Sequence, residues 1–328
     1  GAEEQQLNKR ATTNSEAYQL YLNGVFYHRK GGATTATALN YYNQAVALDP
    51  KFALAWAGVA TAYLTLANNG VIDPKEGIPK ARAAVKTALE LDETLPEAHV
   101  SQALIMVSEW DWSGVQREFK RAFDLNPNLA DAHSRYAGVL SRMGRHTESL
   151  AEAKRSQELD PLDLRQRARE GTVLYFARRY DEAIQTFDAI LKLSPDDQAS
   201  LIYRAYSYSG KGMYQEAVAD YQRIIKADPS TSASTQCFLG YALAQLGKKS
   251  EAQAILEKLK TTKEYVSPAE FAILYVGLGD KEGAIALLEK AYAAHDLQMQ
   301  YLKIDPHYDS LRSDPRFNEL LRKVGLPQ

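Results

Sequence analysis

Four prolines recur at intervals of 34 residues, at Pro127, Pro161, Pro195 and Pro229. A fixed period of this length predicts a repeat architecture, in which each structural unit contacts only its neighbours along the chain. A chain of 328 residues would otherwise be expected to fold as about two globular domains. The period therefore predicts a solenoid, and stacked repeats of this kind offer a long binding surface rather than an enclosed reaction site.

The positions between the prolines also recur. In the unit that starts at Leu164, small residues stand at positions 8 and 20 (Gly171 and Ala183) and an aromatic ring at position 24 (Phe187). Small residues let two antiparallel helices cross closely, and a ring fills the space beside the crossing. The proline then ends the second helix, because it lacks an N–H group and disfavours a helical residue before it. The next unit has the same residue types at these positions, namely Ala205, Ala217 and Tyr221. Glycines mark the turn between the two helices of several units, at Gly144, Gly212, Gly247 and Gly279.

This pattern, together with the phrase Ala55-Trp56, resembles the tetratricopeptide repeat over nearly the whole chain. The resemblance implies an all-α fold, a right-handed superhelical solenoid of antiparallel helix pairs with a C-terminal capping helix. We expect a lead-in over residues 1–16, about eight repeat units over residues 17–295, and a capping segment over residues 296–328. Asp314-Pro315 is expected to start the capping helix. The units are expected to start near Ala17, Ala53, Pro96, Ala130, Leu164, Gln198, Ala233 and Tyr265.

Several phrases carry a narrower resemblance, to the C-terminal repeat region of multidomain bacterial regulators. They are residues 14–22, Trp110-Asp111-Trp112, residues 174–183 and residues 311–317. In such proteins the repeats follow a serine/threonine kinase, a nucleotide cyclase or a winged-helix DNA-binding domain, often after a membrane segment. The chain starts at Gly1 without a methionine, so we expect it to be part of a longer protein. The resemblance implies a cytoplasmic or extracytoplasmic region of a bacterial protein, and it leaves the compartment open.

Composition narrows the kinds of partner. Charged residues make up 24% of the chain and the net charge is −2, which gives no reason to expect nucleic acid or an anionic membrane as a general partner. No apolar run approaches the roughly 20 residues that span a bilayer. The single Cys237 excludes an internal disulfide and a metal site made only of cysteines.

Sequence motifs for chemistry are missing. The chain has no glycine-rich phosphate loop and none of the common hydrolase or metalloprotease motifs. His99 and His133 stand at position 4 of neighbouring units, where we expect them to fill slots between helices. His28 and His146 are expected to be solvated, and His307 has no ligand spacing around it. We therefore predict no catalytic residue, no metal site and no cofactor.

The resemblance places the first helix of each pair on the concave face. It implies that the side chains at positions 2, 5, 9, 12 and 13 of each unit point inward. Tyrosine and arginine at such positions are of interest, because both are common anchors of protein interfaces. Some members of the family bind C-terminal carboxylates through a clamp of basic and amide side chains, and Arg165 and Arg169 match half of it. The positions of the other half hold Val100, Leu104 and Arg135, which do not fit. What remains is a looser preference for acidic peptides. The candidate partner-binding residues are Arg142, Arg165, Arg169, Thr172, Tyr175, Tyr206 and Tyr241. The alternative is that the tyrosines pack against neighbouring first helices.

Two functions follow from these patterns. The first is a non-catalytic scaffold that binds a peptide or partner domain in its concave groove, as part of a larger bacterial signalling or regulatory protein. The alternative is a sensory or self-associating module that controls an attached kinase, cyclase or DNA-binding domain, with a homodimer as one form. Its contact surfaces would be the insertion at residues 68–79 and the turn at Trp110-Asp111-Trp112, which also has a packing interpretation.

Overall fold

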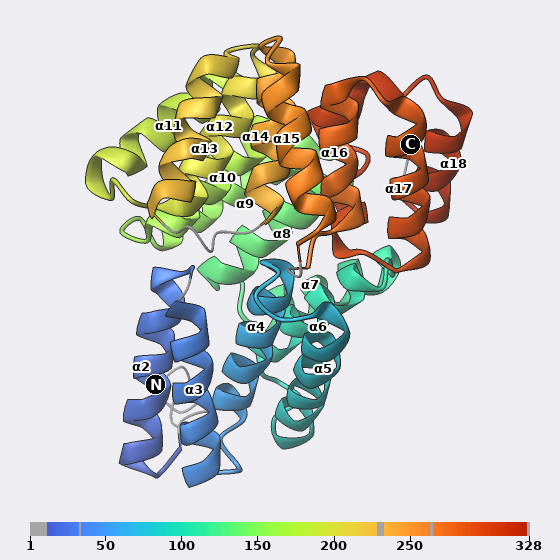
Figure 1. The fold of residues 1–328 in the computed structure, drawn as a ribbon. Coiled ribbons are helices and arrows are strands. Elements are labelled where there is room, and N and C mark those ends of the chain that lie inside the picture. The colour runs from blue at the N-terminus through green and yellow to red at the C-terminus, as the bar shows by residue number, and fades with distance from the viewer. Residues whose placement is uncertain (1–11, 33, 228–232, 263–264, 327–328) are drawn as a thin grey trace. The chain divides into compact units, whose positions relative to one another are not determined.

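The computed structural model describes residues 12–32, 34–227, 233–262 and 265–326, and the chain divides into two compact units, Gly1–Ala132 and His133–Gln328. These two parts are called unit 1 and unit 2. Figure 1 shows coiled ribbons throughout, and the described residues contain no strand. The predicted fold class, an all-α solenoid of antiparallel helix pairs, is confirmed.

Unit 1 consists of consecutive helix pairs. The first helix of each pair is followed by a short turn and a second helix that runs back along it. The helices are α2 (Ser15–Lys30), α3 (Thr34–Leu48), α4 (Ala53–Asn68), α5 (Pro74–Leu91), α6 (Pro96–Ser108) and α7 (Trp112–Leu125).

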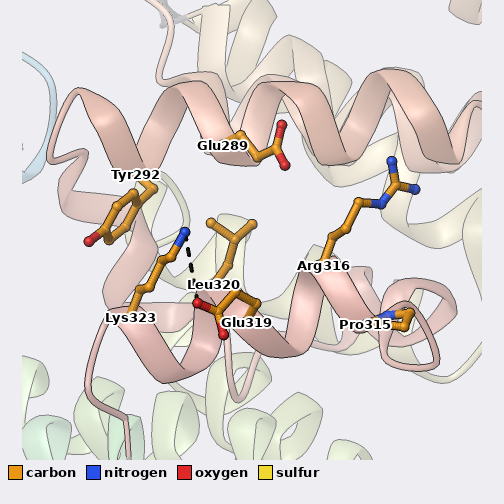
Figure 2. Close-up of a pocket in the computed structure, with 7 residues that line it drawn as sticks. All are labelled: Glu289, Tyr292, Pro315, Arg316, Glu319, Leu320 and Lys323. Atoms are coloured by element: carbon orange, nitrogen blue, oxygen red, sulfur yellow. Dashed lines mark ion pairs between the residues drawn. The ribbon is translucent and has the colours of Figure 1, made fainter.

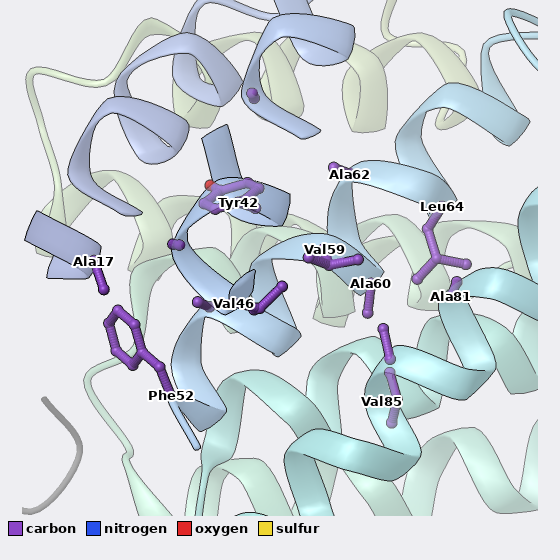
Figure 3. Packing of buried hydrophobic residues seen from close by; sticks show 14 of the residues in the cluster. Ala17, Tyr42, Val46, Phe52, Val59, Ala60, Ala62, Leu64, Ala81 and Val85 are labelled. Atoms are coloured by element: carbon purple, nitrogen blue, oxygen red, sulfur yellow. The ribbon is translucent and has the colours of Figure 1, made fainter. Parts of the chain in front are cut away.

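In the core of unit 1 an aromatic ring packs against glycines of the neighbouring helices. Tyr42 on α3 is 4% exposed and lies between α2 and α4 (Figure 3). A Cβ atom added at Gly24 or at Gly58 would lie 2.5 or 2.8 Å from the Tyr42 ring, closer than real contacts allow. Neighbouring helices can approach this ring only because neither glycine carries a side chain.

Unit 2 continues the same arrangement and ends in a different one. Its helix pairs are followed by two short 3₁₀ helices and a last α-helix. The elements are α8 (Ala130–Arg142), which begins just before the unit boundary, α9 (His146–Leu159), α10 (Leu164–Phe176), α11 (Tyr180–Leu193), α12 (Gln198–Gly210), α13 (Tyr214–Ala227), α14 (Ala233–Gln245), α15 (Lys249–Lys260), α16 (Pro268–Leu278), α17 (Lys281–Ala293), η1 (Leu297–Tyr301), η2 (Pro306–Leu311) and α18 (Pro315–Lys323).

The predicted crossing of small residue and ring is present in unit 2. A Cβ atom at Gly171 on α10 would lie 2.6 Å from Cζ of Phe187 on α11, and Phe187 is fully buried. Burying such a side chain contributes about 1.5–3 kcal/mol to stability. The spacing read from the sequence therefore corresponds to a real packing contact between the two helices of a pair.

Prolines and turn residues fix where the helices end. α7, α9 and α11 each end two residues before Pro127, Pro161 and Pro195, as the sequence predicts, whereas Pro229 lies outside the described residues. Helix pairs begin at Ser15, Ala53, Pro96, Ala130, Leu164, Gln198, Ala233 and Pro268, close to the expected unit starts. The assignment of each pair as one repeat unit stays a prediction.

The last helix starts where the sequence places it. The Asp314 side chain accepts a hydrogen bond of 2.8 Å from the backbone N–H of Arg316, and Pro315 occupies the first turn of α18. A capping carboxylate and a first-turn proline both favour a helix start at this point.

Candidate functional site

A non-periodic stretch near the C-terminus lies on the first helices of unit 2. This stretch, residues 296–312, contains η1 and η2 and is called the return segment here. Its side chains contact α8, α10, α12 and α14, and the face of these helices that it contacts is called the inner face. The inner face is therefore partly covered by the protein's own chain.

Tyr301, the last residue of η1, holds the return segment to α8 and α10. Its ring stacks on Phe176 of α10, with 5.6 Å between ring centroids and 15° between the ring planes. The Arg142 guanidinium lies 4.8 Å from the Tyr301 ring centroid, and its Nη2 donates a hydrogen bond of 2.7 Å to the Tyr301 hydroxyl. Tyr301 thus binds α8 and α10 through stacking, a cation–π contact and a hydrogen bond.

His307 fills an aromatic pocket on the inner face and is 4% exposed. Its Nδ1 lies 2.7 Å from Oδ1 of Asp305. The ring centroids of Tyr206, Phe238 and Tyr241 lie 5.6, 5.1 and 4.8 Å from that of His307. Edge-on packing against three rings explains why the imidazole is held in one place.

Arg178 holds η2 of the return segment. Its two guanidinium Nη atoms donate hydrogen bonds of 2.6 and 2.7 Å to the Asp309 carboxylate. Arg178 stands at the turn position that Gly144 and Gly212 occupy in neighbouring pairs, and it shares their positive φ, at 61°. A left-handed backbone at a residue other than glycine costs about 1–2 kcal/mol, so the two-point contact with Asp309 offsets a local strain.

The candidate residues from the sequence separate into two groups. Tyr175 is 1% exposed, and its hydroxyl lies 3.5 Å from both Asp305 Oδ1 and His307 Nδ1. Tyr206 and Tyr241 are half-buried against His307, so the three tyrosines all contact the return segment.

The arginines and Thr172 form the second group. Arg142 and Arg169 lie close together on α8 and α10, whereas Arg165 pairs with Asp163 at 2.6 Å and does not join them. Thr172 is buried, and its hydroxyl donates to the backbone carbonyl of Ala168.

Comparison with known proteins is consistent with this geometry. Two models of the tetratricopeptide repeat match the sequence, over residues 169–232 and 233–264. The chain is a tetratricopeptide repeat protein. No curated protein matches the sequence. Tetratricopeptide repeats are protein–protein interaction scaffolds that bind protein or peptide partners, and the chain belongs to this class of scaffold.

Several solved structures share the tetratricopeptide repeat fold of the chain. A tetratricopeptide repeat protein from Parabacteroides merdae ATCC 43184 is 16% identical, with a TM-score of 0.53 over 80% of this chain and 98% of that chain. Yeast Tom70 is 15% identical, with a TM-score of 0.51 over 95% of this chain and 68% of that chain. A monomeric mutant of IFIT1 solved with Gppp-AAAA is 14% identical, with a TM-score of 0.61 over 90% and 68%. At these identities the structures show the fold alone.

Three histidines of this tetratricopeptide repeat protein pack against neighbouring side chains. His99 on α6 contacts Glu118 on α7 at 2.8 Å, and His133 on α8 contacts Glu152 on α9 at 2.5 Å, the same contact one repeat later. The expectation for His28 is wrong, because this side chain is 9% exposed and its ring packs beside Tyr42. In the part of the chain that the structure describes, no three His, Cys, Asp or Glu side chains are grouped so as to hold a metal ion.

A surface cleft of about 450 Å³ lies between α17 and α18 (Figure 2). Its charged side chains are mostly paired: Arg316 contacts Glu282 at 2.8 Å and Asp314 at 2.7 Å, and Lys323 lies 3.9 Å from Glu319. Because these charges pair with one another, the cleft presents no set of groups aimed at a ligand. Among the described helices, none has the length and apolar character needed to cross a bilayer.

The sequence did not identify the residues of the return segment. Tyr301, Asp305, His307 and Asp309 lie outside the repeat period, so no equivalent position pointed to them. The sequence did carry a signal, because Leu302, Ile304 and Leu311 are apolar residues in a stretch interrupted by one Asp-Pro step. All three are buried, at 0–5% exposure. Apolar residues that lack helical spacing are typical of a segment that packs on the protein without forming a regular α-helix.

Docking of the return segment gathers carboxylates near the start of α16. Burial, together with the charges of Asp296 and Asp305, raises the pKa of Glu270 to about 7, although a hydrogen bond from Ser234 acts to lower it. Burial also raises the pKa of Asp296, although its Oδ2 accepts a hydrogen bond of 2.6 Å from the Ser267 hydroxyl. The native protein therefore holds a proton on Glu270 at a pH where an unfolded chain releases it.

This proton predicts a pH dependence of stability. The unfolded glutamate titrates near pH 4.5 and the native one near pH 7, so the folded state binds more protons between these values and loses stability as the pH rises through them. We expect Glu270→Gln to exceed the wild type in free energy of unfolding by about 2–3 kcal/mol at pH 8 and by little at pH 4.5. Urea unfolding of both proteins across this range measures the difference.

Glu319→Gln is the matched control, because Arg322 holds the pKa of the exposed Glu319 below its ordinary value. That variant should differ from the wild type by the same amount at pH 5 and at pH 8. A Glu270→Gln difference that does not change with pH would contradict the buried proton.

Proposed function

We propose that the chain is a non-catalytic scaffold that binds an extended segment of a partner protein on the inner face of unit 2. The observation that carries this proposal is that the inner face already accommodates irregular chain, the return segment, through side chains predicted for partner binding. Aromatic anchors, a two-point arginine–carboxylate contact and a buried hydroxyl are the devices by which protein surfaces recognise peptides. The proposal includes no catalytic residue, no metal and no cofactor.

The tyrosines and the arginines have different parts in this proposal. Tyr175, Tyr206 and Tyr241 hold the return segment, which shapes one wall of the binding site. Arg142, Arg165 and Arg169 lie at the α8–α10 end of the inner face and contact the partner. The narrower resemblance of the sequence supports a place for this scaffold in a larger bacterial signalling protein.

Site-specific crosslinking tests where a partner binds. Peptides selected from a random display library on the full chain would be bound to variants carrying a photoreactive residue in place of Arg165 on α10 or of Lys192 on α11. Both positions accept a changed side chain, because Arg165 is 35% exposed and Lys192 is exposed. We expect several-fold more crosslinking at position 165 than at position 192, measured by mass spectrometry.

Equal crosslinking at the two positions would contradict binding on the inner face, as would crosslinking at position 192 alone. Intact-protein circular dichroism of both variants controls for the fold, because neither replacement should change the helical signal.

Self-association is a second candidate function, favoured by an apolar row on α2 of unit 1. Tyr18, Leu22 and Phe26 are 41%, 40% and 54% exposed, and their spacing of four residues places them on one helix face. α2 carries Glu16 in its first turn and Arg29 and Lys30 in its last turn. In an antiparallel pair of α2 helices from two copies, Tyr18 would face Phe26 and the acidic turn would face the basic turn. This surface is thus complementary to itself, as a two-fold interface requires.

Leu22 would lie on the two-fold axis of such a dimer, so Leu22→Glu places two like charges together. We expect wild-type chain to associate weakly, because one helix face buries less than the roughly 1,200–2,000 Å² of a stable interface. Sedimentation equilibrium should show this association lost in Leu22→Glu and kept in Leu162→Glu, whose parent residue is 91% exposed in unit 2. A wild-type chain that is monomeric at every concentration, or an unaffected Leu22→Glu variant, would rule out this interface.

A further inference from the structure

Two arginines converge on one point above α8. A Cβ atom added at Gly138 would lie 3.1 Å from Nη1 of Arg169 and 3.6 Å from Nη1 of Arg142. Two guanidinium groups thus approach the same small volume, and their ends can lie this close to the α8 backbone because Gly138 has no side chain. Like charges this close repel each other unless an opposite charge lies between them.

No carboxylate of the described residues pairs with either arginine. Arg142 donates to the Tyr301 hydroxyl, and the Nε atoms of both Arg142 and Arg169 are buried without a hydrogen-bond partner. Burial lowers the pKa of Arg169, and the charges of Arg142 and Arg135 lower it further. Buried or half-buried cations are normally paired, so this arrangement calls for an explanation.

Other arginines of unit 2 pair with carboxylates, as buried or half-buried cations normally do. Arg204 contacts Asp220 at 2.7 Å and Asp188 at 2.6 Å, and Arg178 contacts Asp309 at 2.6 Å. Even Arg165, one helix turn before Arg169, pairs with Asp163. Arg165 and Arg169 therefore do not form the carboxylate clamp expected from the sequence. Arg169 instead lies beside Arg142 of α8, the first helix of the preceding pair.

We propose that Arg142 and Arg169 bind an oxyanion, the carboxylate of an acidic protein segment or a phosphate group, in the space above Gly138. Two guanidinium forks supply several N–H donors to one planar or tetrahedral anion, which is the geometry that arginine suits best. Tyr301 of the return segment fixes Arg142 and forms one side of the site. The inference rests on the proposed function only in assigning the anion to a partner protein, because the site itself can be tested with small anions.

A tethered anion tests the site without a ligand. In Gly138→Asp the new carboxylate occupies the proposed position, and the arginine ends need to move by only a few tenths of an ångström to admit its Cβ. Gly138→Asn has nearly the same size and no charge. We expect Gly138→Asp to melt several degrees above Gly138→Asn at pH 7, and the gap to narrow as the pH falls below about 4, where the aspartate of the unfolded chain takes up its proton first. Equal melting temperatures at pH 7, or a less stable Gly138→Asp, would overturn the proposal.

Added anions test the site in the full chain. The probes are inorganic phosphate, an amidated tetraglutamate peptide and a tetra-alanine peptide with a free C-terminus, at constant ionic strength set with sodium chloride. We expect at least one probe to raise the wild-type melting temperature by a few degrees, and the responding probe identifies a phosphate, a side-chain carboxylate or a terminal carboxylate. Arg169→Gln and Gly138→Asp should lose this shift, while Arg322→Gln on exposed α18 should keep it.

Arg169→Gln also separates binding from folding. Because it removes a cation without a partner, we expect its melting temperature in chloride alone to equal or exceed that of the wild type. No shift with any probe, or the same shift in Arg169→Gln as in the wild type, would overturn the anion site. Either result would leave the crosslinking test of the inner face to be decided separately.

Discussion

The close crossing of neighbouring helices is the contact on which both units depend. At these crossings a glycine lies against a ring, as Gly24 and Gly58 lie against Tyr42 and Gly171 lies against Phe187. A side chain at the glycine would occupy the volume of the ring, so the two positions constrain each other. One helix pair cannot cover its own apolar face, and each pair is therefore stable only when the next one packs on it.

The return segment covers the apolar side chains that the first helices leave exposed on the inner face of unit 2. Tyr175, Phe176, Tyr206 and Phe238 would otherwise leave an aromatic surface in water. The segment covers them, and its polar groups find partners there: the Tyr308 hydroxyl donates to the carbonyl of Ala269 at 2.7 Å, and Asp309 accepts from Arg178. Satisfied hydrogen bonds matter as much as apolar contact, because a buried polar group without a partner costs about 1–3 kcal/mol. Arg142 and Arg169 differ from the other described arginines, because their buried Nε atoms have no hydrogen-bond partner, and this contrast supports the anion site.

The sequence predicted what the repeat period encodes. Helix pairs, their turns and their ends follow from local patterns, and the roles of Gly171, Phe187, Pro195 and Gly212 follow from their spacing alone. The return segment has no period, and its docking joins residues as far apart as Arg142 and Tyr301. Such long-range contacts depend on side-chain shape in three dimensions, which no spacing rule encodes. Tyrosines at inward positions were found, but their contacts with the protein's own chain were not.

Amide hydrogen exchange of residues 297–311 tests the central claim most directly. If the return segment is an integral part of the inner face, its amides should exchange as slowly as those of α12, and both should lose protection together as urea is added. Exchange of residues 297–311 at the rate of an unstructured chain, while α10 and α12 stay protected, would contradict the account. It would show that the aromatic inner face is open to other partners without the cover of its own chain.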